Sequence, residues 1–148
     1  MPAPTVIVDT GPIVALLDAD ETHHAWARKQ FGALGAPLLT CEAVLSEASF
    51  LLQRAGADQS LPVTLVGRGV LRVEKAVSGE ADGLAVSRLM RCYHNVPMSF
   101  ADACLVRLLD GIDNASIMTL DSDFRIYRQA GRRVIPLLMP TEAGESAP

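Results

Sequence analysis

A short apolar run near the start of the chain ends directly on an acid. Residues 6–8 are Val-Ile-Val, with Pro4 before them and Asp9 immediately after them. A fully apolar run bounded in this way is typical of a strand buried on both faces of a parallel sheet. Pro12 suits the first turn of a helix, so a helix is expected to follow. This opening constrains the fold more than any other feature, because a parallel strand needs covering layers on both faces.

Strands and helices alternate along the rest of the chain. Short apolar runs predict further strands at 38–40, 71–73, 116–120 and 133–138. Helices are predicted over 22–31, 42–55, 62–68, 80–92 and 99–110, and Thr22 and Ser99 are expected to cap two of them. This alternation predicts an α/β fold with a central, mostly parallel sheet of four to five strands.

Composition limits the class of protein. The chain has 148 residues, 49% of them hydrophobic, and no apolar run approaches the roughly 18–20 residues of a membrane-spanning helix. The first residues lack the basic segment of a secretion signal, so we expect a cytoplasmic protein with one domain over 1–139 and a loose tail over 140–148. The net charge of −4 argues against a protein that coats nucleic acid by bulk positive charge.

Acidic residues stand where predicted strands end. Asp9 follows the first strand and Asp121 follows the strand 116–120. Both are therefore expected at the same edge of the sheet, beyond the carboxyl ends of the strands, where α/β proteins bind ligands. Asp102 falls in the first turn of the helix that begins at Ser99, a place where the helix dipole by itself also favours an acid.

A fourth acid lies within the helix predicted over 42–55. Glu47 recurs at helical spacing with the apolar residues Val44, Ala48 and Leu51, so it is expected to interrupt an apolar stripe. A carboxylate that faces a core must be paired, protonated or bound to a cation. We therefore place Glu47 with the three aspartates.

Four acids from four elements need a counter-charge. Oxygen ligands favour hard cations, so the sequence predicts one or two Mg²⁺ or Mn²⁺ ions that activate water for phosphodiester hydrolysis. Asp123, two residues after Asp121, is either a further ligand or a solvated turn acid. Thr10 and Thr119 are weaker candidates for orienting a ligand or water.

Four segments resemble the motifs of the PIN-domain family, in the family's order. They are residues 6–12 (Val-Ile-Val-Asp-Thr-Gly-Pro), 43–48 (Ala-Val-Leu-Ser-Glu-Ala), 99–103 (Ser-Phe-Ala-Asp-Ala) and 119–124 (Thr-Leu-Asp-Ser-Asp-Phe). The resemblance covers residues 5–138 and implies a PIN-like three-layer α/β/α sandwich. Gly11 and Pro12 depart from the family's pattern, in which serine and other residues are frequent there.

Among PIN domains, this chain most resembles the VapC toxins of bacterial toxin–antitoxin pairs. The resemblance implies a Mg²⁺- or Mn²⁺-dependent endoribonuclease, usually a homodimer, that a VapB-like antitoxin holds inactive. It makes Asp9, Glu47, Asp102 and Asp121 the catalytic, metal-binding acids, with Asp123 as a further candidate. RNA rather than DNA as the substrate rests on the resemblance alone.

Other interpretations stay open at this point. Arg125 and Arg128, in a basic cluster that extends to Arg133, either contact RNA phosphates, receive the antitoxin or form a solvated edge. A phosphatase of the haloacid dehalogenase type also begins with a strand ending in Asp, but it needs a second acid where this chain has Gly11. A non-catalytic PIN-like binding module is the remaining alternative.

Overall fold

Five short strands form one parallel sheet in the order β3-β2-β1-β4-β7, as seen in a computed structural model that describes residues 4–141. The sheet consists of β1 (Thr5–Val8), β2 (Leu38–Thr40), β3 (Leu71–Val73), β4 (Ala115–Met118) and β7 (Leu137–Leu138). The helices are α1 (Thr10–Leu17), α2 (His24–Ala33), α3 (Glu42–Arg54), α4 (Leu61–Gly67), α5 (Glu80–Cys92) and α6 (Phe100–Asp110). A short 3₁₀ helix, η1 (Ser122–Arg125), precedes a two-stranded hairpin of β5 (Arg128–Gln129) and β6 (Arg133–Val134).

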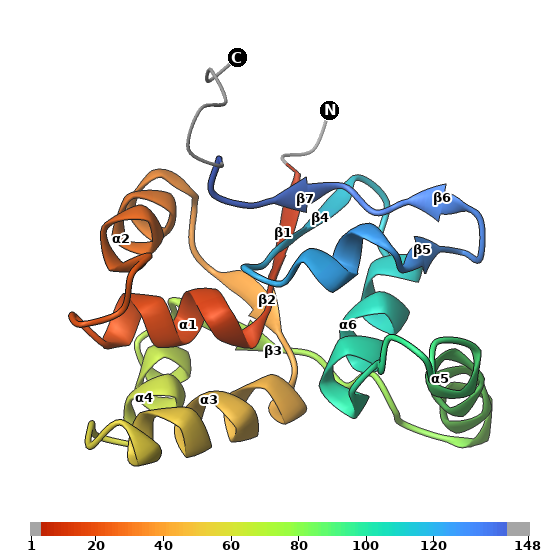
Figure 1. Cartoon of the computed structure of the whole chain (residues 1–148), viewed down its shortest axis with the longest axis horizontal. Helices are drawn as coiled ribbons and strands as arrows, with labels where there is room; N and C mark the ends of the chain where they lie inside the picture. Colours follow the sequence, from red (N-terminus) through yellow and green to blue (C-terminus); the bar gives the residue numbers. More distant parts are fainter. Residues whose placement is uncertain (1–3, 142–148) are drawn as a thin grey trace.

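Helices cover both faces of the sheet (Figure 1). Helices α1 to α4 pack against one another on one side, whereas α5 and α6 pack together on the other side. Parallel neighbours need such crossover connections, because a tight turn cannot join the end of one strand to the start of the next. The predicted three-layer α/β/α sandwich is confirmed.

The centre of the molecule is built from β1 and α6. Ile7 and Val8 of β1 are fully inaccessible to solvent, as the uninterrupted apolar run predicts. Helix α6 is nearly as enclosed, because α5 packs along it and β4 lies beneath it. Its buried side chains are Ala101, Asp102, Ala103, Cys104, Leu105, Val106 and Leu109. An acid in the first turn of so buried a helix is held in a fixed position.

The register of β1 against β4 brings distant residues together at the carboxyl edge of the sheet. Val8 lies opposite Met118, and the backbone N–H of Asp9 donates to the carbonyl of Met118 at 2.9 Å. Strand β4 ends at Met118, two residues before the predicted end. Asp9 and Thr119 therefore leave the sheet side by side.

Two further predicted elements differ from the structure. The run 133–138 is divided, because β6 pairs with β5 in the hairpin whereas β7 joins the main sheet beside β4. Pro136 separates the two strands, since proline has no N–H to donate to a neighbouring strand. The prediction that Thr22 caps the second helix was wrong, because α2 begins at His24 with His23 at the cap position. Nδ1 of His24 lies 2.7 Å from the carbonyl oxygen of Ala15 and ties α2 to α1.

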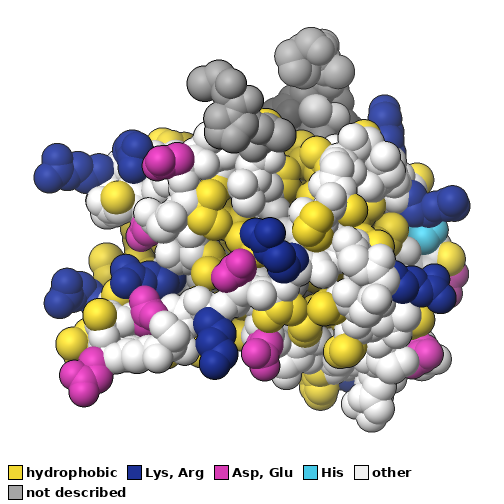
Figure 2. Space-filling model, turned by 180° about the vertical axis from the view of Figure 1, so that it is seen from behind, with side chains coloured by type: hydrophobic (Ala, Val, Ile, Leu, Met, Phe, Trp, Pro, Cys, Tyr) yellow, Lys and Arg dark blue, Asp and Glu magenta, His cyan; other side chains and the backbone are white. Residues whose placement is uncertain are grey.

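The surface carries mixed charge. On the face seen in Figure 2, basic side chains are interspersed with acidic ones and do not gather into one patch. No helix among residues 4–141 is long and apolar enough to cross a membrane. The tail predicted over 140–148 falls mostly outside the described residues, and the domain boundary at 139 stays a prediction.

Candidate active site

One cleft at the carboxyl edge of the sheet collects all five acids that the sequence singles out. It has a volume of about 760 Å³. The acids that line it are Asp9, Glu47, Asp102, Asp121 and Asp123. They come from the end of β1, from α3, from the first turn of α6 and from the segment after β4. The sheet topology, rather than any proximity in sequence, therefore brings them together.

Asp9 lies at the floor of this cleft and is buried. It caps α1, and its Oδ1 accepts a hydrogen bond from the backbone N–H of Thr10 at 2.8 Å. Its Oδ2 accepts a bond from the hydroxyl of Thr119 at 2.7 Å. Burial and, to a smaller extent, the nearby charges of Asp102 and Asp121 raise the pKa of Asp9 to about 7, although these two bonds act to lower it.

Asp102 is held by three groups. The Ser99 hydroxyl accepts a bond from the Asp102 N–H at 3.0 Å, and the Asp102 carboxylate accepts one from the Ser99 N–H at 3.3 Å, which forms a capping box. The hydroxyl of Tyr127 donates to Oδ2 of the same carboxylate at 2.9 Å. Burial nevertheless raises the pKa of Asp102. The predicted cap at Ser99 is confirmed, and the acid of the capping box also lines the cleft.

Glu47 lines the cleft for a different reason from the one expected. The core-facing stripe of α3 consists of Val44, Ala48 and Leu52, so Glu47 does not interrupt it and is exposed. The prediction that Glu47 faces a core was therefore wrong. Its Oε2 accepts a hydrogen bond from the hydroxyl of Thr10 at 2.9 Å, which turns the side chain toward the cleft.

The segment after β4 is folded around its acids. The N–H of Asp121 donates to the hydroxyl of Thr119 at 2.9 Å, the same hydroxyl that donates to Asp9. The carboxylate of Asp121 accepts a bond from the N–H of Asp123 at 2.9 Å and so caps η1. Thr119 thus links the ends of β1 and β4, and Thr10 links Asp9's helix to Glu47.

The two arginines proposed as substrate contacts lie outside the lining of this cleft. One terminal nitrogen of Arg128, Nη1, donates to the carbonyls of Arg125, Ile126 and Tyr127 at 2.7 to 3.1 Å. That nitrogen therefore stabilises the turn leading into the hairpin. Arg125 is exposed on η1 and lines a separate, smaller pocket with Ser122.

The sequence did not identify Tyr127 or the apolar wall of the cleft. Tyr127 stands among arginines in the sequence, yet it is fully buried, with its ring 5.1 Å from those of Phe124 and Tyr93. Phe50 and Leu51 line the cleft from α3 although they are apolar and exposed. Only the i to i+3 and i+4 spacing from Glu47 hinted that they would share its surroundings.

The chemistry of this donor set fits a hard divalent cation. Its charged members are all carboxylates, and the described lining contains no lysine, arginine or histidine that would neutralise them. The raised pKa of Asp9 shows that its negative charge is poorly compensated by the chain itself. Within residues 4–141, however, no three acidic, histidine or cysteine side chains converge into a ready-made metal centre. The acids are instead bonded to hydroxyls and backbone N–H groups.

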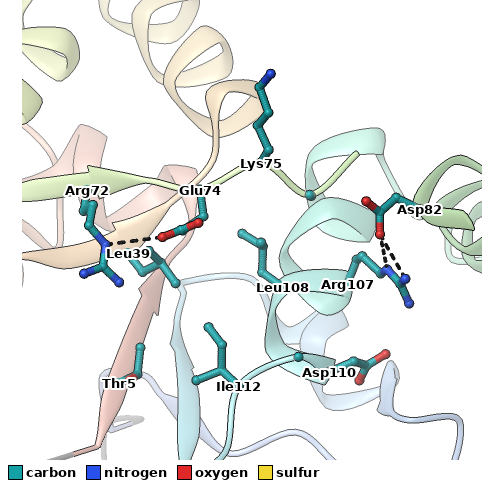
Figure 3. A pocket seen from close by; sticks show the side chains of 12 residues that line it. Thr5, Leu39, Arg72, Glu74, Lys75, Asp82, Arg107, Leu108, Asp110 and Ile112 are labelled. Carbon is teal, nitrogen blue, oxygen red and sulfur yellow. Dashed lines mark hydrogen bonds and ion pairs between the residues drawn. The ribbon is translucent and has the colours of Figure 1, made fainter. Parts of the chain in front are cut away.

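A second pocket, of about 500 Å³, provides a contrast within the same molecule (Figure 3). It lies between β1 to β3 and the end of α6. Here two of the three acids in the lining face cations: Arg107 donates to Asp82 at 2.9 and 3.0 Å, and Arg72 lies 3.5 Å from Glu74. This pocket holds paired charges, whereas the acidic cleft does not.

Comparisons with known proteins agree with this geometry. The family model described as "PIN domain" matches residues 6–130. Ribonuclease VapC26 of Mycobacterium tuberculosis is 30% identical over 117 residues, which cover 78% of this chain and 86% of that protein. The crystal structure of Mycobacterium tuberculosis VapC20, described as a Sarcin-Ricin loop cleaving toxin, has a similar fold. It superposes with a TM-score of 0.64 at 23% identity, covering 89% of this chain and all of that one.

Proposed function

This chain belongs to the PIN-domain family, and from that premise we propose that it is a VapC-type toxin, an endoribonuclease that depends on Mg²⁺ or Mn²⁺. The observation that carries the proposal is the acidic cleft, where the buried Asp9 lies near the charges of Asp102 and Asp121 without a basic side chain in the lining. Support for RNA as the substrate comes from the names of its relatives, one a ribonuclease and one a toxin that cleaves the Sarcin-Ricin loop.

In this proposal Asp9, Glu47, Asp102 and Asp121 hold the ion, with Asp123 as a further ligand. An ion held by these acids would supply a lowered pKa for bound water and positive charge opposite the scissile phosphate. The chain's own groups fix the acids in place: the Thr119 hydroxyl orients Asp9, and the Thr10 hydroxyl orients Glu47. Whether one ion or two are bound is part of what the experiment below measures.

The remaining parts of the proposal concern partners. We infer a homodimer in the cytoplasm, inhibited by a VapB-like antitoxin, as in the toxins that this chain resembles. Arg125, exposed on η1 near the segment that carries Asp121 and Asp123, is the more accessible of the two arginine candidates for an RNA phosphate. Arg128 already uses Nη1 for the backbone, so its part in binding is confined to its other nitrogens.

The test is cleavage of a cellular RNA pool by purified protein, with Mg²⁺, with Mn²⁺ and with a chelator. We expect discrete cuts in either metal, none with chelator, and none in Asp102→Asn. Asparagine can still accept from the Ser99 N–H, so the variant keeps its capping bond while losing the charge. Titration of the Asp102→Asn and wild-type proteins with Mn²⁺ gives the number of ions.

Two results would contradict the proposal. One is full activity in Asp102→Asn, which would remove that acid from the site. The other is a well-folded, antitoxin-free protein that cuts no RNA in either metal, which would favour the non-catalytic binding module. The haloacid dehalogenase alternative fails, because Gly11 stands where that class needs a second acid and the chain belongs to another family.

A further inference from the structure

We propose that the ring of Phe50 stacks on a nucleobase of single-stranded RNA next to the phosphate that is cut, an inference that rests on the proposed ribonuclease function. Phe50 is a large apolar side chain with 56% of its surface exposed. It lines the same cleft as the acids rather than a separate surface. Exposure of such a ring costs free energy unless something covers it in the working complex.

The position of Phe50 on α3 follows from its distance to Glu47 in the sequence. Phe50 and Leu51 come three and four residues after Glu47, and side chains at these spacings are neighbours on a helix, with about 5–6 Å between their Cβ atoms. One turn of α3 therefore carries the acid and the next turn carries the apolar pair. A nucleotide has the same order of parts, a charged phosphate followed by a flat base.

The cleft has two kinds of lining. Among its acids, Asp9 and Asp102 are buried, whereas Glu47 and Asp121 are exposed. Phe50, Leu51 and Pro97 contribute its apolar part. Single-stranded RNA is recognised in proteins largely by stacking its unpaired bases on aromatic rings, which every base tolerates because each has a π-face.

Arg54 adds a positive group beside the ring. Its guanidinium carbon lies 5.8 Å from the centre of the Phe50 ring, one helical turn further from Glu47. The guanidinium stays exposed at the surface of α3, where it can meet the next phosphate along the strand. Acid, ring and arginine thus follow one another along successive turns of α3.

A protein partner is the other class of molecule that could cover Phe50. Phe50 and the acids line one cleft, and this arrangement favours RNA as the partner. A base stacked on Phe50 leaves its own phosphate beside the acids, whereas a protein that only covers Phe50 does not require acids nearby. A contact with a second copy of this chain is therefore an outcome of the test rather than the proposal.

The experiment measures steady-state cleavage of a short single-stranded RNA that spans a cut mapped with the wild-type protein. We expect Phe50→Ala to raise KM at least about fivefold with kcat little changed, the size of one lost stacking contact. Phe50→Trp should restore KM, because it keeps an aromatic face. Leu84→Ala, at an apolar side chain that is 65% exposed on α5, is the matched control and should leave KM unchanged.

Abasic substrates make the test specific to the base. Removing the base on one side of the cut should raise the KM of the wild type about as much as Phe50→Ala does, with no further rise when the two changes are combined. Three results would overturn the inference. The first is an unchanged KM in Phe50→Ala, and the second is an equal rise of KM in Leu84→Ala. The third is a KM of Phe50→Ala on the abasic substrate that rises by the product of the two separate effects. A changed molar mass of Phe50→Ala with KM unaltered assigns Phe50 to a contact between copies. Absence of any cut by the wild type refutes the ribonuclease itself, a separate result.

Discussion

The acidic cleft and the pocket of Figure 3 are both lined by aspartates, but the aspartates have opposite surroundings. In the pocket, the N–H and hydroxyl of Ser78, and then Arg107, hold the pKa of Asp82 below its usual range. In the cleft, burial raises the pKa of Asp9 to about 7. One acid is stabilised as an anion by the chain, and the other is not.

This contrast separates a structural charge from a functional one. Asp82 needs nothing from outside, because its partners connect α5 to α6 and to the turn at Ser78. Asp9 is held in place by Thr10 and Thr119, yet its charge is left for a ligand to neutralise.

Replacing the charge of Asp9 should stabilise the metal-free protein. A pKa raised from 3.8 to about 7 means that the folded state keeps a proton that the unfolded chain releases, so this contribution to stability is lost as pH rises through 7. Asp9→Asn avoids that loss, and an amide can still accept from the Thr10 N–H. We expect it to raise the free energy of unfolding at pH 8 by about 2–4 kcal/mol, with the gain disappearing toward pH 4.

Urea unfolding in chelator at pH 8 and at pH 5 measures this gain. Addition of Mg²⁺ should then raise the stability of the wild type and leave Asp9→Asn unchanged, since ligand binding stabilises only the state that binds. Equal stabilities of the two proteins at pH 8 without metal would show that the chain already compensates Asp9, and the contrast with Asp82 would be lost.

The sequence predicts the carboxyl-edge acids because they depend on local patterns. An apolar run followed by an acid places Asp9 and Asp121 at strand ends, and Ser99 marks the start of the helix that carries Asp102. Glu47 shows the limit of such reasoning. An apolar stripe through Val44 and Ala48 can continue to Leu51 or to Leu52, and the two possibilities look alike in the sequence. Only packing decides that α3 buries Leu52 rather than Leu51.

Contacts between distant segments were not predictable. The Thr119 hydroxyl meets Asp9 across 110 residues because of the β1 to β4 register, which the apolar pattern of each strand does not specify. Tyr127 looks like a surface residue among arginines, and its burial arises from packing against Phe124 and Tyr93. The division of 133–138 into two strands likewise depends on which neighbour each half finds.

Removing the hydroxyl of Tyr127 should weaken catalysis without unfolding the protein. Tyr127→Phe keeps the ring contacts with Phe124 and Tyr93 but removes the bond to Oδ2 of Asp102. Losing a hydrogen bond to the charged form raises the pKa of Asp102 further. We expect a fall in kcat/KM of about tenfold, the usual cost of losing a group that orients a metal ligand.

The pH profile distinguishes this effect from a packing defect. The acidic limb of kcat/KM should move to higher pH in Tyr127→Phe. Tyr93→Phe is the matched control, because it also removes a hydroxyl from this ring cluster. The Tyr93 hydroxyl accepts a hydrogen bond from the Arg128 N–H and does not donate to an acid. An identical change in both variants would assign the effect to the cluster rather than to Asp102.

The smallest effect is expected in the paired pocket. Asp82→Asn removes the charge that faces Arg107, so the melting temperature should fall slightly at pH 7. The difference should shrink at acidic pH, as the pH falls through the lowered pKa of Asp82. Asp58→Asn is the control, because Ser60 donates to Asp58 but no arginine does. RNA cleavage and the Mg²⁺ response should match the wild type. Because α6 carries both Arg107 and Asp102, a loss of cleavage would instead show that this ion pair positions the catalytic helix, and the two regions would then work as one.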